Sequence, residues 1–309
     1  MPGIGISNAI PFNKGVSWSS YWSTLISATV ENAAPTHVVL TFPTAADLND
    51  TDFTIEGFTI SSASWTGAVL TLVLSEAVIY FNRDLTITFG KTSETATVTN
   101  NVADDGNTVG WYDIGDGSAT YMTKDGSNFV SQWNDLSGSS HPLLQAAGTN
   151  QPLYQSTGIL FDGIDNFLKT TAFTLNQPLT YYLVFKQIGW NAGAYIFDGN
   201  NTPSVVCYQK TSTPRINLFA GSDACIYNGY TLGVFGILTT EFNGANSFLQ
   251  HNANAAVTGN PGANNAGGFK LNGGVVNMEV KELIIRKVAD DSATNTIIRN
   301  YLNDKYSIY

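Results

Sequence analysis

The 309-residue sequence has little charge and very little basic charge. Its 14 Lys and Arg residues stand against 24 Asp and Glu, which gives a net charge of −10. No Lys or Arg cluster is present to meet phosphates, which argues against nucleic acid or an anionic membrane as the main partner. No apolar run approaches the roughly 20 residues that a membrane helix needs. The start, MPGIGISNAI, lacks a basic segment followed by an apolar run, so we expect no secretory signal peptide.

Cysteine is also scarce. Cys207 and Cys225 are the only two in the chain. Two cysteines do not make the disulfide framework of a small secreted scaffold. We interpret both as small buried side chains. Whether they pair stays open, because a sequence does not give the distance between two strands.

The common catalytic and metal-binding motifs are missing. His37, His141 and His251 lie far apart and lack the spacing of metal ligands. No GxSxG, HExxH or P-loop pattern occurs. Nucleophilic and metal-assisted hydrolysis therefore find no support in the sequence.

Paired carboxylates of the glycosidase kind are not evident either. Retaining glycosidases commonly use two carboxylates about 5 Å apart, and residues two apart share one face of a strand. Glu279 and Glu282 come nearest, but their spacing predicts opposite faces of a regular strand. Glu241 stands alone. We therefore predict that the chain is not an enzyme.

Aromatic side chains, 29 glycines and alternating apolar residues dominate what is present, and they predict an all-β protein. In the first part, Val69, Thr71 and Val73 alternate as in a strand with one buried face. The expected strands there are 36–42, 52–60, 68–75, 85–89 and 95–99. Their spacing of roughly 8–12 residues, with turn residues between them, is typical of a β-sandwich over 33–101.

A polar, acidic stretch at 102–107 predicts a linker, and a second domain then spans 108–309. Its expected strands are 179–187, 194–199, 204–209, 215–220, 224–228, 233–243, 247–252 and 276–287. A Gly-rich surface loop is expected at 253–268. Asp290, Asp291 and Ser292 offer an N-cap for a helix over about 293–305. One face of this helix is expected to carry Ile297, Ile298, Tyr301 and Leu302.

Two family resemblances follow from these stretches. The segments QWNDLSG, GILFDGIDNFL and the ending ELIIRKVADD…IIRNYLNDKYSIY resemble concanavalin A-like (laminin G-like) jelly-roll domains. The run PTHVVLTF…AVLTLVLSEAV…LTITF resembles bacterial immunoglobulin-like domains, which recur in surface proteins and phage particles. The resemblances imply an immunoglobulin-like sandwich followed by a jelly roll with a C-terminal helix.

Residues 1–32 form an aromatic N-terminal segment. Phe12, Trp18, Tyr21 and Trp22 lie in a stretch otherwise rich in Gly and Ser. They predict either a first strand packed on the next domain or an attachment segment whose aromatics dock into another protein. The segment also resembles the starts of some bacteriophage virion proteins.

Glycan binding requires aromatic platforms for sugar faces and amide or carboxylate groups for hydroxyls, placed on loops. The candidates, each of which also suits core packing, are Trp190, Asn191, Tyr195, Tyr227, Asn228, Tyr230 and Asn243.

Calcium is the one cofactor that the sequence leaves open. Relatives of the jelly-roll fold hold this ion with loop carboxylates, and calcium takes hard oxygen ligands. The candidates are Asp113 and Asp116 in YDIGDG with Asp162 and Asp165 in FDGIDN. Asp-Gly is also ordinary turn chemistry.

Together these features lead to one functional expectation. The resemblances imply a non-enzymatic bacteriophage virion protein, a capsid decoration or fibre-type subunit made in the host cytoplasm. Its N-terminal part would contact other virion proteins, while the lectin-like domain would face host-surface glycans on the virion surface. The alternatives are a bacterial surface carbohydrate-binding or adhesion module and a divergent glycoside hydrolase. Oligomeric state and position on a particle stay open.

Overall fold

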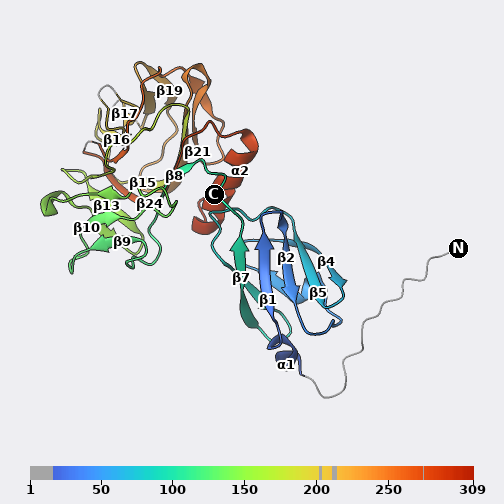
Figure 1. Cartoon of the computed structure of the whole chain (residues 1–309). Coiled ribbons are helices and arrows are strands. Elements are labelled where there is room, and N and C mark those ends of the chain that lie inside the picture. Colours follow the sequence, from blue (N-terminus) through green and yellow to red (C-terminus); the bar gives the residue numbers. More distant parts are fainter. Residues whose placement is uncertain (1–16, 202–203, 211–213, 274) are drawn as a thin grey trace. The chain divides into compact units, whose positions relative to one another are not determined.

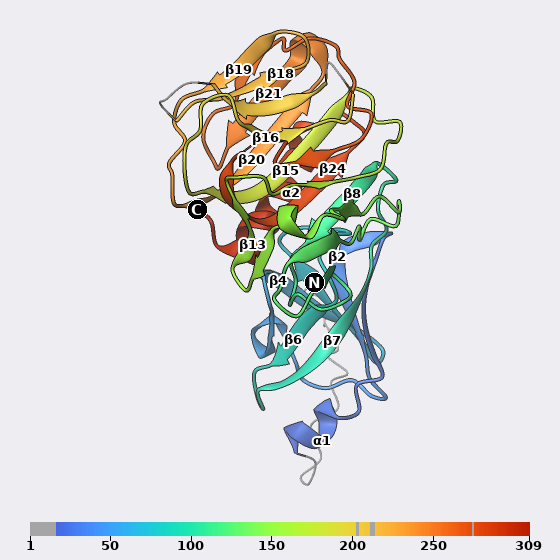
Figure 2. The ribbon, with the colours of Figure 1, turned by 90° about the vertical axis from the view of Figure 1, so that its left-hand side faces the viewer.

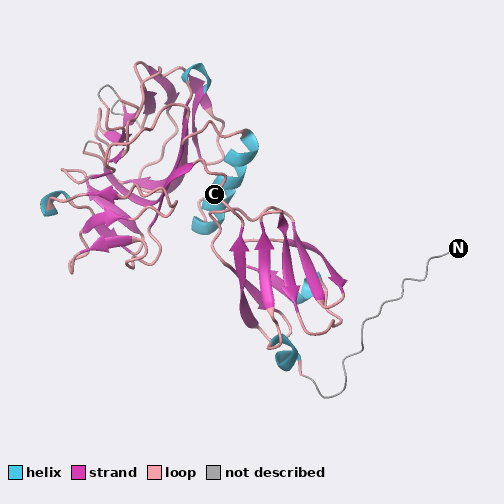
Figure 3. Ribbon diagram, viewed as in Figure 1, coloured by secondary structure: helices cyan, strands magenta, loops and turns pink. Residues whose placement is uncertain are grey.

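A computed structural model describes residues 17–309 apart from 202–203, 211–213 and 274. Strands far outnumber helices among these residues (Figure 3), which confirms the all-β class and the sandwich architecture. The chain divides into two compact units between Asp104 and Asp105 (Figure 1), inside the stretch expected to be a linker. No helix within the described residues has both the length and the apolar character to cross a membrane.

The first unit is a β-sandwich. Among the described residues its strands follow the order β3-β6-β7-β1-β2-β5-β4, and β6 and β7 lie side by side in Figure 2. The parallel pairing of β1 with β7 joins two antiparallel groups. Its elements are α1 (Trp18–Trp22), β1 (Ser27–Glu31), β2 (Ala34–Thr41), η1 (Asp50–Asp52), β3 (Phe53–Ile55), β4 (Ile60–Thr66), β5 (Val69–Leu74), β6 (Leu85–Phe89) and β7 (Glu94–Asn101).

The aromatic N-terminal segment belongs to this fold from Trp18 onward. Tyr21 and Trp22 are 6% and 5% exposed and form part of the core. The Tyr21 ring stacks on Phe42 with centroids 5.0 Å apart, and its hydroxyl donates to the carbonyl of Thr44 at 2.6 Å. Trp22 stacks on Phe89 with centroids 5.1 Å apart.

Docking into another protein is therefore wrong as an explanation for Tyr21 and Trp22, because their rings already fill the sandwich. Trp18 is half-buried against Phe89, at 5.9 Å between ring centroids. Phe12 lies outside the described residues. The first strand, β1, begins within the expected attachment segment and buries Ala28 and Val30 on one face.

The second unit is a larger two-sheet sandwich. In the part that the structure describes, one sheet follows the order β19-β18-β17-β16-β23-β14-β11-β10-β9. The other follows β12-β13-β24-β15-β20-β21-β22, and β8 also pairs with β24. Its elements are β8 (Thr108–Asp113), β9 (Met122–Lys124), β10 (Val130–Trp133), β11 (Leu143–Leu144), η2 (Gly148–Asn150), β12 (Leu153–Gln155), β13 (Gly158–Asp162), β14 (Leu168–Lys169), β15 (Leu179–Gln187), β16 (Tyr195–Asp198), β17 (Val206–Gln209), β18 (Ile216–Phe219), β19 (Asp223–Tyr227), β20 (Phe235–Phe242), η3 (Gly244–Asn246), β21 (Ser247–His251), β22 (Val257–Gly259), β23 (Lys270–Leu271), β24 (Asn277–Arg286) and α2 (Ser292–Tyr306).

The core of the second unit lies between its two sheets. Alternate residues of β15 point inward, so Tyr181, Leu183 and Phe185 meet residues such as Phe197 of the opposite sheet. Cys207 and Cys225 are free and buried in the same core, which confirms their interpretation as small buried side chains. Burial raises the pKa of both thiols, so neither is a ready nucleophile.

Helix α2 covers the outer face of the sheet that contains β15, β20 and β24, strands that run side by side in Figure 2. Its N-cap is Asp291, whose carboxylate accepts from the Thr294 amide at 2.7 Å. Glu282 on β24 is fully buried beneath the helix. It accepts hydrogen bonds from Trp111 Nε1 (2.8 Å), Tyr301 Oη (2.8 Å), Lys305 Nζ (2.7 Å) and Tyr306 Oη (2.7 Å).

A β-bulge in β24 changes where its carboxylates point. Val184 pairs with Glu282 while Phe185 pairs with Val280, so Lys281 is an extra residue. Glu279 pairs with Lys186, which lies two residues from Val184 and on the same face of β15. Glu279 and Glu282 therefore share the outer face, and their predicted placement on opposite faces is wrong.

Candidate functional site

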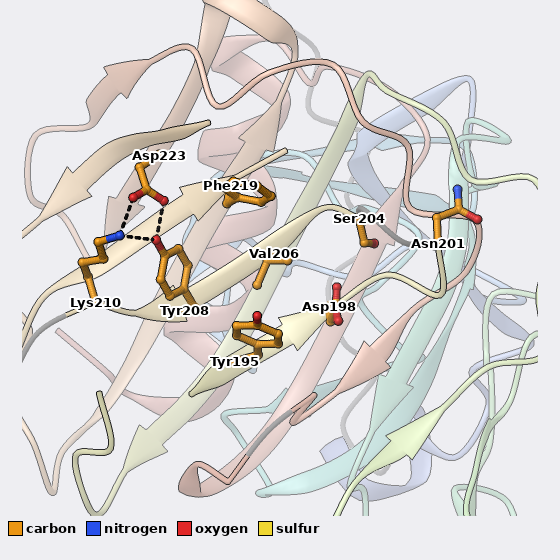
Figure 4. Close-up of a pocket in the computed structure, with 9 residues that line it drawn as sticks. All are labelled: Tyr195, Asp198, Asn201, Ser204, Val206, Tyr208, Lys210, Phe219 and Asp223. Atoms are coloured by element: carbon orange, nitrogen blue, oxygen red, sulfur yellow. Dashed lines mark hydrogen bonds and ion pairs between the residues drawn. The ribbon is translucent and has the colours of Figure 1, made fainter. Parts of the chain in front are cut away.

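A pocket of about 560 Å³ lies on the outer face of the sheet formed by β16, β17, β18 and β19 (Figure 4). Nine of the described residues line it: Tyr195, Asp198, Asn201, Ser204, Val206, Tyr208, Lys210, Phe219 and Asp223. A volume of this size is in the usual range for small-ligand sites, roughly 300–1,000 Å³.

Strand pairing brings these side chains together. Tyr195 pairs with Tyr208, and Val206 pairs with Phe219, which in turn pairs with Asp223. The intervening residues, such as Cys207, face the core. Alternation therefore separates a buried inner row from an outer row that forms the pocket floor.

Two aromatic rings form a corner of the pocket. Tyr195 is 38% exposed, and its ring meets the Tyr208 ring edge-to-face with centroids 6.1 Å apart. Val206 and Phe219 add apolar surface beside them (Figure 4). The corner can contact one face of a flat or ring-shaped ligand.

One end of the pocket is a closed polar triad. Lys210 Nζ donates to Tyr208 Oη at 3.1 Å and pairs with Asp223, while Tyr208 Oη donates to Asp223 (Figure 4). Burial and the hydrogen bond to Asp223 raise the pKa of Tyr208. Hydrogen bonds to Asp223 and Tyr208 raise the pKa of Lys210, which stays charged. Each of the three side chains already has a partner.

The opposite end of the pocket is polar but unsatisfied. Asp198 Oδ1 and Ser204 Oγ are buried, and neither atom makes a well-aligned hydrogen bond within the described residues. The two side chains are still close enough for the Ser204 hydroxyl to stabilise the Asp198 carboxylate. Ser204 itself is only 5% exposed. Burial raises the pKa of Asp198, against the opposing effects of the Gly199 amide, the nearby Ser204 hydroxyl and Lys270. Buried polar atoms of this kind are costly unless water or a ligand satisfies them.

The structure places Tyr195, among the predicted glycan-binding residues, in this pocket. Trp190 is half-buried and packs against the core. Asn191 is exposed on a neighbouring loop, where its backbone N–H donates to Gln209 Oε1 at 2.7 Å. Neither residue lines the pocket.

The other predicted glycan-binding residues lie elsewhere. Tyr227 and Tyr230 are buried in the core, so their rings do not form open platforms. Tyr230 Oη accepts from the Gln187 amide at 3.3 Å. Asn228 is exposed, and Asn243 donates to Glu241 Oε1 at 3.2 Å.

Sequence reasoning missed most of the pocket. The residues not predicted are Asp198, Asn201, Ser204, Val206, Tyr208, Lys210, Phe219 and Asp223. A partial signal existed in SVVCYQ, where alternation puts Val206 and Tyr208 on one face. The sequence does not indicate which strands lie beside Val206 and Tyr208.

The four aspartates considered for calcium do not come together. Asp113 is buried and accepts from Lys305 Nζ at 2.7 Å, while Asp116 accepts from the Ser118 amide at 2.9 Å. Asp162 accepts from the Ile164 amide at 2.8 Å, and Asp165 is exposed. Across residues 17–309, leaving aside the undescribed positions, no three His, Cys, Asp or Glu side chains are grouped to hold a metal ion.

Among known proteins, matches to this chain occur only with solved structures. No family model and no curated protein matches the chain. A Trypanosoma rangeli sialidase matches with 9% identity and a TM-score of 0.47, covering 89% of this chain and 52% of that one. The same sialidase with sialic acid matches with 10% identity, a TM-score of 0.47, and coverage of 90% and 53%. The VIP36 exoplasmic/lumenal domain, in its Ca²⁺/Man3GlcNAc-bound form, matches with 9% identity, a TM-score of 0.33, and coverage of 45% and 84%.

The chain thus spans about half the length of these two sialidase chains. The matches also include a sialidase mutant displaying trans-sialidase activity. The prediction that this chain is not an enzyme is contradicted by these matches and is withdrawn. Two carboxylates about 5 Å apart are the mark of one glycosidase mechanism. Glycosidases with a tyrosine nucleophile do not follow that pattern, so its absence does not exclude an enzyme. With TM-scores below 0.5, the likenesses assign no role to any residue of this chain.

Proposed function

We propose that this chain is a carbohydrate-binding protein and that the pocket over β16–β19 holds the saccharide. The observation that carries the proposal is the combination of an exposed aromatic corner with the buried oxygens of Asp198 and Ser204, which line the pocket without a well-aligned hydrogen bond to the described residues. A sugar ring has an apolar face that packs on aromatic rings and hydroxyl groups around its edge that donate and accept hydrogen bonds.

The arrangement of the pocket supports this ligand class. Tyr195 and Phe219 offer apolar contact in the middle of the site, and Asp198 and Ser204 offer hydrogen-bonding atoms at one edge (Figure 4). A purely apolar ligand would leave Asp198 Oδ1 and Ser204 Oγ unsatisfied, at a cost of about 1–3 kcal/mol for each group. Sugar hydroxyls would satisfy both atoms and keep the ring on the aromatic corner.

The test is binding of the full chain to a glycan array, followed by titration calorimetry with the best ligand. Tyr195→Ala removes the exposed ring and should weaken binding about tenfold or more, which corresponds to about 1.4 kcal/mol. Phe129→Ala is the matched control, because Phe129 is 39% exposed and does not line the pocket. Absence of any bound glycan, or equal affinity of Tyr195→Ala and native protein, would overturn the proposal.

The surface of a bacteriophage particle is the setting that we propose for this binding. Its support is the resemblance of the sequence to virion proteins and the chaining of two β-sandwich units in one chain. Attachment to other virion proteins would use the exposed surface of the first unit, since Tyr21 and Trp22 are buried. Mass spectrometry of purified virions tests this setting, and absence of the chain from particles would favour a bacterial surface adhesion module instead.

A further inference from the structure

The two polar ends of the pocket differ in what they offer a ligand. At one end Lys210, Tyr208 and Asp223 bind one another (Figure 4). At the other end Asp198 and Ser204 each present a buried oxygen with no hydrogen bond of ordinary geometry to the described residues. Val206 and Phe219 lie between the two ends. New hydrogen bonds to a ligand are therefore concentrated at the Asp198 end.

The charge of the lining is negative. Its described residues include one cation, Lys210, and two carboxylates, Asp198 and Asp223, so the formal sum is +1 − 2 = −1. The Lys210 charge is neutralised by its pairing with Asp223. Lys270 acts on Asp198 from outside the lining, and no ion pair between the two is present among the described residues. Arg215 likewise acts on Asp223 from outside the lining. Inside the lining Lys210 is already paired with Asp223, so an anion that enters the pocket would approach the Asp198 carboxylate.

From this charge arrangement we infer that the pocket selects neutral saccharides and rejects acidic ones, with a sugar hydroxyl donating to Asp198 Oδ1. The inference rests on the proposed function and names the ligand class of the same site. A carboxylate is an acceptor only, so a hydroxyl suits it and a uronate carboxylate does not. Hydrogen bonds to an ionised acceptor are among the stronger ones, while placing like charges together at an interface is strongly unfavourable.

The experiment compares neutral gluco-, galacto- and manno-oligosaccharides with their uronate counterparts, which differ only by oxidation at C6. For the full native chain, the best neutral ligand should bind at least tenfold tighter than its uronate counterpart. Asp198→Asn removes the negative charge but keeps the size and one acceptor. It should weaken the neutral ligand several-fold and reduce the preference over the uronate to less than about threefold.

Asp165→Asn is the control for the change in net charge. Asp165 is exposed and outside the pocket, so both the affinity and the neutral-to-uronate ratio should stay at native values.

The outcomes separate the two proposals. If no oligosaccharide binds, the proposed function fails and the ligand class fails with it. If neutral sugars bind at the pocket but uronates bind equally well or better, the inference is overturned while the proposed function stands. The same holds if Asp198→Asn folds normally and leaves the ratio unchanged.

Discussion

Replacing Trp22 by alanine tests whether the aromatic start of the chain is core. Trp22 is 5% exposed, and its ring centroid lies 5.1 Å from Phe89, 6.1 Å from Phe53 and 6.2 Å from Phe42. Truncating a buried aromatic residue to alanine costs about 3–5 kcal/mol. Since a domain is stable by only about 5–15 kcal/mol, the first unit should lose a large part of its stability.

The expected change in melting temperature is large. For a domain of about 100 residues, 1 kcal/mol corresponds to roughly 4–8 °C, so a loss of about 4 kcal/mol lowers Tm by roughly 15–30 °C. Scanning calorimetry of the full chain measures this shift, and hydrogen exchange assigns the affected transition to the first unit. The second unit should melt as in the native chain.

Ser19→Ala is the matched control on the same helix. Ser19 is exposed, so its replacement should change stability by no more than about 0.5 kcal/mol. A Trp22→Ala variant that melts within a few degrees of the native chain would refute the core assignment. It would return Trp22 to the role of an attachment residue.

Three further predictions concern buried and paired charges. Glu282→Leu leaves Lys305 with one fewer carboxylate under α2 and should destabilise the second unit by about 3–5 kcal/mol in urea unfolding. Burial lowers the pKa of His251 to about 4, below its value of 6.5 in the unfolded chain. The free energy of unfolding should therefore be unaffected by His251 above pH 6.5 and should fall as the pH drops towards 4, because the unfolded state binds the proton first. An NMR titration should give this pKa, and His251→Asn should remove that part of the pH dependence. Although burial opposes it, Arg286 holds the pKa of Asp105 at about 2. Asp105→Asn should therefore cost less than about 1 kcal/mol at pH 7 and clearly less at pH 2, where about half of the folded molecules have Asp105 protonated. An equal loss at both pH values would contradict the last prediction.

Most of the fold could be predicted because its strands carry a strong local pattern. The expected strand at 179–187 coincides with β15, and the expected helix at about 293–305 is α2 at Ser292–Tyr306. Their alternation and capping residues are local properties that neighbours in the chain determine. A first strand packed on the next domain was one of two alternatives for residues 1–32, and β1 confirms it. The bounds of β1 could not be predicted, because its run SATVE is short and follows an aromatic stretch. Its partner β7 comes about 70 residues later, so the pairing has no local signal.

The pocket could not be predicted in the same way. Its residues come from four strands and the segments beside them, and they become neighbours only through pairing and register. Tyr195 was found because it follows a loop with aromatic and amide residues. Tyr227 looks equally suitable in the sequence but faces the core, since the burial of an aromatic depends on which side of its strand is covered.

The bulge at Lys281 has a consequence for related chains of other lengths. Deleting Lys281 would leave Glu282 opposite Val184 and Val280 opposite Phe185, so the ladder would become regular and every other side chain would keep its side of the sheet. Loss of a residue elsewhere in β24 would move the side chains on one side of the gap to the opposite face of the sheet. A single-residue gap in an alignment is therefore expected at this position, and the shortened strand would contain Glu-Val-Glu. Its two carboxylates would then lie two residues apart, which is the spacing that places side chains on one face of a regular strand. In the present sequence Glu279 and Glu282 share a face although they are three residues apart.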